Sequence, residues 1–217
     1  MILLALLFAA ETGALAGKVS LEGLAPRLAN LPVTKDNKAC GNSKLDESLE
    51  VKDGGVKNAV VWFLDLAERK DAASPAREKL DQLQCQFVPH VLVAPQGSTL
   101  DVVNSDKALH NVRAQAGESK LMNYAMPIPG HVVPTRLKND GIFRVSCDVH
   151  PWMRAWIIVL PTRAYAVTDE EGKYRIEDLP PGKHRVKIWH ERLGEREAEV
   201  EIPPRGTATH DVRFTSR

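Results

Sequence analysis

Four side chains that bind soft metal ions stand out in this sequence by their type and spacing. Cys147, His150 and Met153 follow one another as Cys-x-x-His-x-x-Met, and His110 lies earlier in the chain, shortly after a strand-like segment. If the two strands are neighbours, one thiolate, two imidazoles and one thioether converge. Sulfur ligands favour copper, and imidazole suits both Cu(I) and Cu(II). Zinc would instead prefer a carboxylate, a third Cys or His, or water.

The segments around these residues predict how they are positioned. In residues 142–147 the side chains of Phe143, Val145 and Cys147 share one face of a strand, and the first two are apolar. Cys147 is therefore expected to face the core. The loop after it contains Pro151, which limits its flexibility. Upstream, a strand ends at an Asn-Ser-Asp turn, and His110 opens the next strand.

The pattern resembles the cupredoxin family. The Cys-x-x-His-x-x-Met spacing, the preceding His110-Asn111 pair and the short loop with Pro151 and Trp152 are most similar to the amicyanin-like members. The resemblance covers residues 87–160 and includes further matching positions in the expected order, namely Phe87, Val88, Pro89, Gly97 and Asn104. It implies a Greek-key β-sandwich that binds one type 1 copper per chain through His110, Cys147, His150 and an axial Met153. It also implies that the amide groups of Asn111 fix the ligand loop and hydrogen-bond near the sulfur of Cys147.

Each of these residues also has a structural interpretation. A lone buried Cys is usually a small apolar residue, a lone Met usually fills a core, and His110 could be a capping or core histidine. Other His and Met residues without a place in the pattern are interpreted as structural, with a Cu(I)-passing role left open for the two methionines: His90, His131, His190, Met122 and Met126.

The cysteine count and the N-terminus suggest export. If Cys147 binds a metal ion, Cys40 and Cys85 remain as an even pair for one disulfide, the alternative being two separate buried thiols. Residues 1–16 resemble a signal peptide, with an apolar run at 2–10 and a small-residue cleavage signal before Gly17, although no Lys or Arg precedes the run. The run is short and interrupted by Glu11, so a membrane span is not expected. These features predict a periplasmic or secreted protein.

Composition and turn spacing predict a soluble all-β chain. Hydrophobic residues make up 43% of the 217 residues, charged residues 26%, and the net charge is +1. Such a balance gives no overall field to attract nucleic acid, and the mature form is not expected to insert into a membrane. Short strand-like runs alternate with Gly, Pro and Asn/Asp turns, and one helix is predicted from Ser74-Pro75 to about Leu83.

The character of the sequence changes after Pro161. Residues 166–176 form a hairpin pattern around an acidic turn, and a Pro-Gly turn follows at 179–182. This resembles the carboxypeptidase regulatory-like, transthyretin-like β-sandwich, which is noncatalytic. We therefore expect a smaller β-sandwich at 161–217 after a cupredoxin-like domain at 17–160. Strands from 17–66 could complete the smaller sandwich, so tandem and inserted arrangements both remain open.

These observations predict a one-electron carrier that cycles between Cu(I) and Cu(II) and serves unidentified redox partner proteins. His150 is expected near the surface, with Pro151 and Trp152 as an apolar docking patch. The alternatives are a periplasmic copper trafficking or storage protein, and a noncatalytic cell-envelope module with a stabilising metal site. An enzyme is not expected, because the chain has no His-x-His pair, Gly-x-Ser-x-Gly motif or His-Glu-x-x-His motif.

Overall fold

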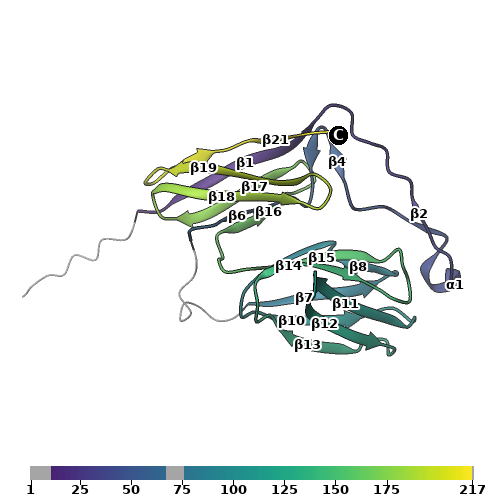
Figure 1. Ribbon diagram of the computed structural model, residues 1–217. Helices are drawn as coiled ribbons and strands as arrows, with labels where there is room; N and C mark the ends of the chain where they lie inside the picture. Colours follow the sequence, from purple (N-terminus) through teal and green to yellow (C-terminus); the bar gives the residue numbers. More distant parts are fainter. Residues whose placement is uncertain (1–10, 67–75, 217) are drawn as a thin grey trace, which may run out of the picture. The chain divides into compact units, whose positions relative to one another are not determined.

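The computed structural model describes residues 11–66 and 76–216, which form β-strands and one short helix (Figure 1). The described chain divides into two compact units. Of the described residues, the first contains 11–25, 50–66 and 164–216, and the second contains 26–49 and 76–163. No helix in the described part of the chain is long and apolar enough to span a membrane.

The second unit contains two sheets. One has the strand order β13-β10-β7-β8, and the other has the order β12-β11-β14-β15-β9. Their bounds are β7 (Arg77–Leu83), β8 (Gln86–Val88), β9 (Val91–Pro95), β10 (Thr99–Asn104), β11 (His110–Ala116), β12 (Ser119–Met126), β13 (Val132–Arg136), β14 (Gly141–Ser146) and β15 (Arg154–Leu160). Residues 31–44 add β2 (Leu31–Pro32), α1 (Asn37–Cys40) and β3 (Ser43–Lys44).

Side-chain alternation along these strands builds the core of the second unit. Phe143, Val145 and Cys147 are all buried, as their alternation predicts, and they join one apolar cluster. Val112 and Ala114 on β11 belong to the same cluster. Fully burying an apolar side chain of the size of Val or Phe stabilises a fold by about 1.5–3 kcal/mol. This cluster therefore fixes the strands that carry the candidate metal ligands.

The helix predicted up to Leu83 is wrong over its described residues. Residues 77–83 form β7, which runs parallel to β10, and Leu80 is fully buried. The side chain of Gln82 donates to the backbone oxygen of Val103 over 2.8 Å. Pairing with a distant strand overrides the local helix signal, while the predicted start at Ser74-Pro75 lies outside the described residues.

The first unit is built around β1 (Gly13–Glu22). This strand pairs antiparallel with β17 and parallel with both β20 and β21. A second sheet has the order β16-β6-β18-β19. The bounds are β4 (Val51–Lys52), β5 (Gly55–Val56), β6 (Val60–Phe63), β16 (Tyr165–Val167), β17 (Lys173–Leu179), β18 (Gly182–His190), β19 (Gly194–Ile202), β20 (Thr207–Thr209) and β21 (Val212–Thr215).

Strands from both ends of the sequence therefore complete the same unit. β6 pairs with β16 and with β18, just as β1 pairs with the C-terminal strands. The described residues 26–49 and 76–163 interrupt this unit in the sequence and form the other one. The continuous range 17–160, expected for one domain, thus contains strands of both units.

The start of β1 bears on the cleavage point predicted before Gly17. Leu15 is fully buried and lies opposite Ile176, and Ala16 lies opposite Arg175 in the same ladder. Gly17 is itself required, because a Cβ atom there would lie 2.0 Å from the backbone oxygen of His210. A chain that began at Gly17 would lack the buried first part of the central strand.

We expect Leu15→Ala to lower the free energy of unfolding by about 2–5 kcal/mol, because it leaves a cavity beneath β1. Urea denaturation of residues 11–217 measures this change. Leu24→Ala is the matched control, since Leu24 is 92% exposed, and we expect it to stay within about 0.5 kcal/mol of the parent chain.

A chain that begins at Gly17 should unfold at lower urea concentration than one that begins at residue 11. Equal urea midpoints for the two chains, or equal effects of the two leucine substitutions, would contradict the central role of the first residues of β1.

Candidate metal centre

The candidate metal ligands meet at one end of the sheet that contains β11 and β14. These strands are antiparallel, with Arg113 opposite Ser146, so the beginning of β11 lies beside the end of β14. His110 is the first residue of β11, and Cys147 directly follows β14. His150 and Met153 lie in the loop that leads to β15. Neighbouring strands therefore bring His110 to the Cys-x-x-His-x-x-Met loop.

Three of the four predicted ligands are close enough to share a metal ion. One nitrogen each of His110 and His150 and the sulfur of Cys147 lie within 4.8 Å of one another. The two Nδ1 atoms are 2.9 Å apart, and Cys147 Sγ lies 4.0 Å from His150 Nδ1. Both histidines are fully buried and Cys147 is 4% exposed. Met153 is buried in the adjoining apolar cluster, and its backbone N–H donates to the His150 carbonyl.

This donor set fits copper by its chemistry. Two neutral imidazoles and one thiolate, with a thioether on the same loop, match the ligands of blue-copper sites. Burial excludes water from the position between them, which favours a fixed set of protein ligands. The residues present are therefore suited to hold a copper ion at His110, Cys147 and His150.

Backbone groups hold the thiol of Cys147 in a polar setting. The N–H groups of Asn111 and His150 each donate to its sulfur over 3.4 Å. Burial raises the pKa of the Cys147 thiol, but hydrogen bonds from His110 and these N–H groups outweigh burial and lower it. The site thus favours the thiolate, the form that binds metal ions.

Asn111 links the two segments that carry the ligands. Its side-chain oxygen accepts a hydrogen bond from the N–H of Asp148 over 2.9 Å, and its side-chain nitrogen donates to Asn123 over 2.7 Å. Its contact with Cys147 Sγ comes from the backbone N–H and not from the side-chain amide. Asn111 therefore fixes the start of the ligand loop against β11 and β12.

Two carboxylates that belong to no predicted ligand motif complete the centre. Asp106 Oδ2 lies 2.8 Å from His110 Nε2, and Asp36 Oδ2 lies 2.9 Å from His150 Nε2. Asp106 lies in the predicted turn just before His110, so its position could have been noticed. Asp36 is separated from His150 by 114 positions, and no local pattern connects them.

The carboxylates and the thiolate set the protonation of the two histidines. For His110, burial lowers the pKa, but Asp106 and Cys147 outweigh burial and raise it to about 9. For His150, burial lowers the pKa, and His110 adds to this effect against the opposing influence of Asp36. A protonated His110 can therefore donate from Nδ1 to neutral His150 Nδ1, and His150 Nε2–H can donate to Asp36.

The predicted docking patch is wrong for Trp152, and His150 does not lie at the surface. Trp152 is 6% exposed, and its indole N–H donates to the backbone oxygen of Cys85 over 3.2 Å. The centroids of the Trp152 and His150 rings are 4.9 Å apart. Pro151 is exposed. Trp152 therefore supports the site from within.

The predicted disulfide is present between Cys40 and Cys85. Cys85 also lies within 4.8 Å of Asp106 and His110 in a second cluster of possible ligands. Its sulfur is bonded to Cys40, so it is not available as a thiolate. The disulfide is thus a structural neighbour of the metal centre.

The remaining His and Met residues of the sequence analysis lie elsewhere in the fold. His90 and His190 are buried, whereas His131 is exposed. Met122 and Met126 are buried on strand β12 and not in a loop.

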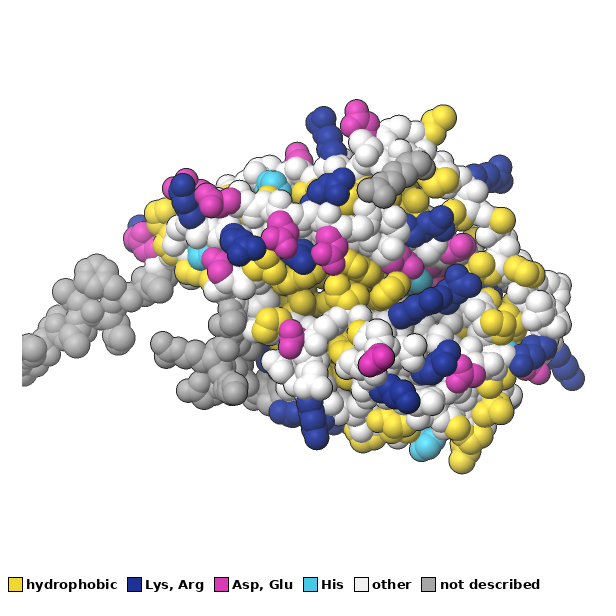
Figure 2. All heavy atoms as spheres, viewed as in Figure 1, with side chains coloured by type: hydrophobic (Ala, Val, Ile, Leu, Met, Phe, Trp, Pro, Cys, Tyr) yellow, Lys and Arg dark blue, Asp and Glu magenta, His cyan; other side chains and the backbone are white. Residues whose placement is uncertain are grey.

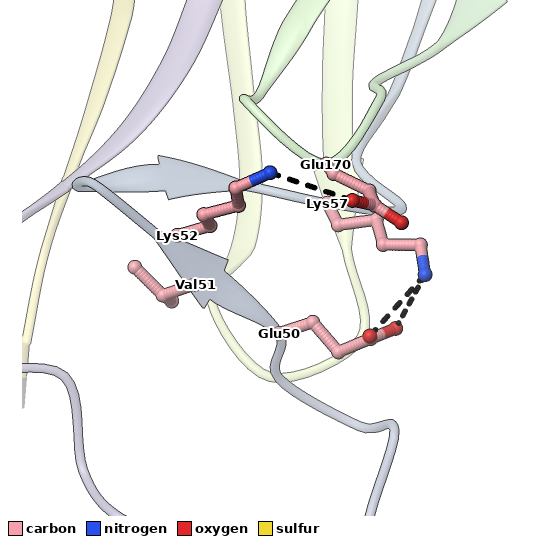
Figure 3. Close-up of a pocket in the computed structure, with 5 residues that line it drawn as sticks. All are labelled: Glu50, Val51, Lys52, Lys57 and Glu170. Atoms are coloured by element: carbon pink, nitrogen blue, oxygen red, sulfur yellow. Dashed lines mark hydrogen bonds and ion pairs between the residues drawn. The ribbon is translucent and has the colours of Figure 1, made fainter.

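A pocket in the first unit offers no comparable metal chemistry. Its lining residues are Glu50, Val51, Lys52, Lys57 and Glu170 (Figure 3). Lys57 pairs with Glu50 over 3.2 Å, and Lys52 pairs with Glu170 over 3.6 Å (Figure 3). These charges neutralise one another, and the lining contains neither His nor Cys.

Comparison with protein families finds a carboxypeptidase regulatory-like domain at residues 150–215. The matched segment includes β16 to β21, which belong to the first unit. β1 and β6 lie outside the match, yet they pair with strands inside it. The regulatory-like resemblance noted in the sequence is thereby confirmed. No curated protein sequence matches the chain.

Several solved structures are similar to part of this chain. A Cu-containing nitrite reductase from Thermus scotoductus SA-01 is 21% identical with a TM-score of 0.36, and the match covers 45% of this chain and 26% of that one. Amicyanin from Paracoccus versutus is 19% identical with a TM-score of 0.35, covering 46% and 97%. A purple cupredoxin from Nitrosopumilus maritimus is 22% identical with a TM-score of 0.30, covering 34% and 81%. The chain thus spans about a quarter of the nitrite reductase chain.

We expect the His110 imidazole of the metal-free protein to titrate with a midpoint of about 9. Asp106→Asn should lower that midpoint by at least about one unit, because it removes the carboxylate that stabilises the imidazolium. Histidine NMR titration measures both values, with Asp140→Asn as the control at an exposed carboxylate. Since a metal ion must displace this proton, its apparent affinity should rise roughly tenfold per pH unit below the midpoint.

A His110 midpoint at its ordinary value, or no change in Asp106→Asn, would contradict the proton arrangement described above.

Proposed function

We propose that the protein is an exported type 1 copper protein that carries one electron at a time. His110, Cys147 and His150 would hold the ion, with Met153 as the weak axial ligand. The observation that carries this proposal is the convergence of two Nδ1 atoms and one sulfur within 4.8 Å in a buried site. When bound there, copper would supply a one-electron Cu(I)/Cu(II) couple.

The surroundings of the ligands support a carrier. A carrier benefits from ligands that move little between redox states. Here β11 and β14 fix His110 and Cys147 through a shared ladder and core, and Asn111 ties the ligand loop to β11. Hydrogen bonds to the ligands also tune the metal, since the groups around a metal site control its potential.

The number of possible sites supports one copper ion per chain. Among residues 11–66 and 76–216, both clusters of side chains that could share a metal ion contain His110. One of them depends on Cys85, which is in a disulfide. A carrier requires one redox centre and a surface for its partner, and we propose this role in preference to an enzymatic one.

The partner of such a carrier would be another redox protein, which must approach close to the ligands. Positive and negative side chains are mixed over the visible surface, in keeping with the net charge of +1 (Figure 2). Local apolar contacts are therefore better suited to docking than a long-range field. Leu109 is 49% exposed beside His110, and Pro151 is exposed beside His150. We propose that these two residues contact the partner.

The disulfide supports export to an oxidising compartment. Disulfides persist in secreted and periplasmic proteins and are rare where cytosolic reductants act. The Cys40–Cys85 bond is buried at both residues. This chemistry supports the proposal of a periplasmic or secreted location.

We expect addition of Cu(II) to residues 11–217 to produce an intense visible thiolate-to-copper band that reductant bleaches reversibly. Cys147→Ser should abolish the band because it removes the thiolate, whereas His131→Gln should retain it because His131 is exposed and outside the site. Visible absorption and cyclic voltammetry measure the band and the couple.

A colourless protein that still binds Cu(I) tightly would reject the carrier role and favour copper trafficking or storage. If the protein binds no copper, both copper functions are rejected, and the remaining alternative is a noncatalytic module of the cell envelope.

A further inference from the structure

Residues 31–44 form an arm that reaches the metal centre from outside the two sheets of the second unit. β2 and β3 pair with Leu31 opposite Lys44, and α1 lies between them. The N–H of Val33 donates to the Asn42 carbonyl over 3.1 Å, which closes the base of the arm. Apart from Cys40, no residue of this segment belongs to a recognisable sequence motif.

The arm is fastened to the second unit at its tip. Cys40, the last residue of α1, is disulfide-bonded to Cys85. Val33 and Cys40 are 7% and 2% exposed and belong to the core cluster that includes Cys147 and Met153. A short segment with one covalent and one apolar anchor has little freedom to leave the surface that it covers.

The same tip presents Asp36 to His150. The Asp36 carbonyl accepts hydrogen bonds from the N–H groups of Ala39 and Cys40, which ties Asp36 to the disulfide residue. Asp36 has φ 52° and ψ 32°, a left-handed conformation that costs a non-glycine residue about 1 kcal/mol or more. Its carboxylate lies 2.9 Å from His150 Nε2 and is itself half exposed. The arm thus stands between His150 and solvent.

The other end of the disulfide is connected to His110. The N–H of Cys85 donates to Asp106 Oδ2 over 2.7 Å, and the N–H of Gln84 donates to Oδ1 over 2.6 Å. Asp106 Oδ2 in turn lies 2.8 Å from His110 Nε2. The carbonyl of Cys85 also accepts the indole N–H of Trp152, which packs on His150.

We propose that Asp36 and Asp106 are positioning residues for the two histidines, and that the Cys40–Cys85 disulfide holds the arm as a closed cover over His150. Each carboxylate fixes the tautomer and orientation of its imidazole with Nδ1 directed to the metal position. The disulfide joins the segment that supplies Asp36 to Cys85, whose N–H donates to Asp106. The positioning role rests on the proposed copper function, whereas the cover is a property of the metal-free chain.

The cover can be tested without metal by the reactivity of His150 toward diethyl pyrocarbonate, followed by peptide mass spectrometry. In the metal-free full chain we expect His150 to react at least tenfold more slowly than His131, which is exposed. In Cys40→Ala/Cys85→Ala the rate at His150 should rise at least tenfold, while the rate at His131 stays unchanged. Asp36→Ala, which keeps the disulfide, should give a smaller rise.

Two results would overturn the proposal that the arm covers His150. One is a His150 as reactive as His131 in the parent chain, and the other is full protection of His150 in a folded Cys40→Ala/Cys85→Ala variant. If that variant does not fold, the Asp36→Ala variant decides the question, because Asp36 is half exposed and its loss leaves the disulfide in place. A His150 reaction rate in Asp36→Ala equal to that of the parent chain would then overturn the proposal.

The positioning role is tested by the midpoint potential of the copper-loaded protein. Asp36→Asn and Asp106→Asn should each raise the potential, because loss of a nearby negative charge favours Cu(I). Asp140→Asn is the matched control and should leave it unchanged. Potentials equal to that of the parent chain in both variants would overturn the positioning role.

The two tests separate the two ideas. A protected His150 in a chain that never binds copper would reject the proposed function and retain the cover. A reversible blue centre with a freely reactive His150 would reject the cover alone.

Discussion

The antiparallel pairing of β11 with β14 is the constraint on which the candidate centre depends. It places His110 at the start of one strand beside Cys147 at the end of the other. Alternating apolar residues on the two strands bury their shared face, so the packing that stabilises the second unit also determines the separation of the ligands.

Features that depend on the order of residues within a short segment could be predicted from the sequence. The Cys-x-x-His-x-x-Met loop, the burial of Cys147 and the strand that begins at His110 follow from alternation and turn residues. The pairing of Cys40 with Cys85 could be predicted because they are the two cysteines that remain when Cys147 is assigned to the metal ion. The meeting of His110 with that loop depended on a family resemblance, since strand order is not encoded in any one segment.

Other features could not be predicted because they arise from distant contacts. Asp36 reaches His150 only through the fold of the arm, and Trp152 is turned inward by its hydrogen bond to the Cys85 carbonyl. The Ser74-Pro75 start signal predicts a helix to about Leu83, but residues 77–83 form a parallel ladder with β10. Local propensity is a weak guide where a segment can pair with a strand far away in sequence.

The position of β1 has a consequence for the order in which the chain can fold during synthesis. The first described strand pairs with β17, β20 and β21, and its partner residues lie as far away as Thr215. The second unit is complete once residue 163 has been made. Its metal ligands can therefore assemble while β1 still has unpaired edges, because β17, β20 and β21 all follow residue 163 in the sequence.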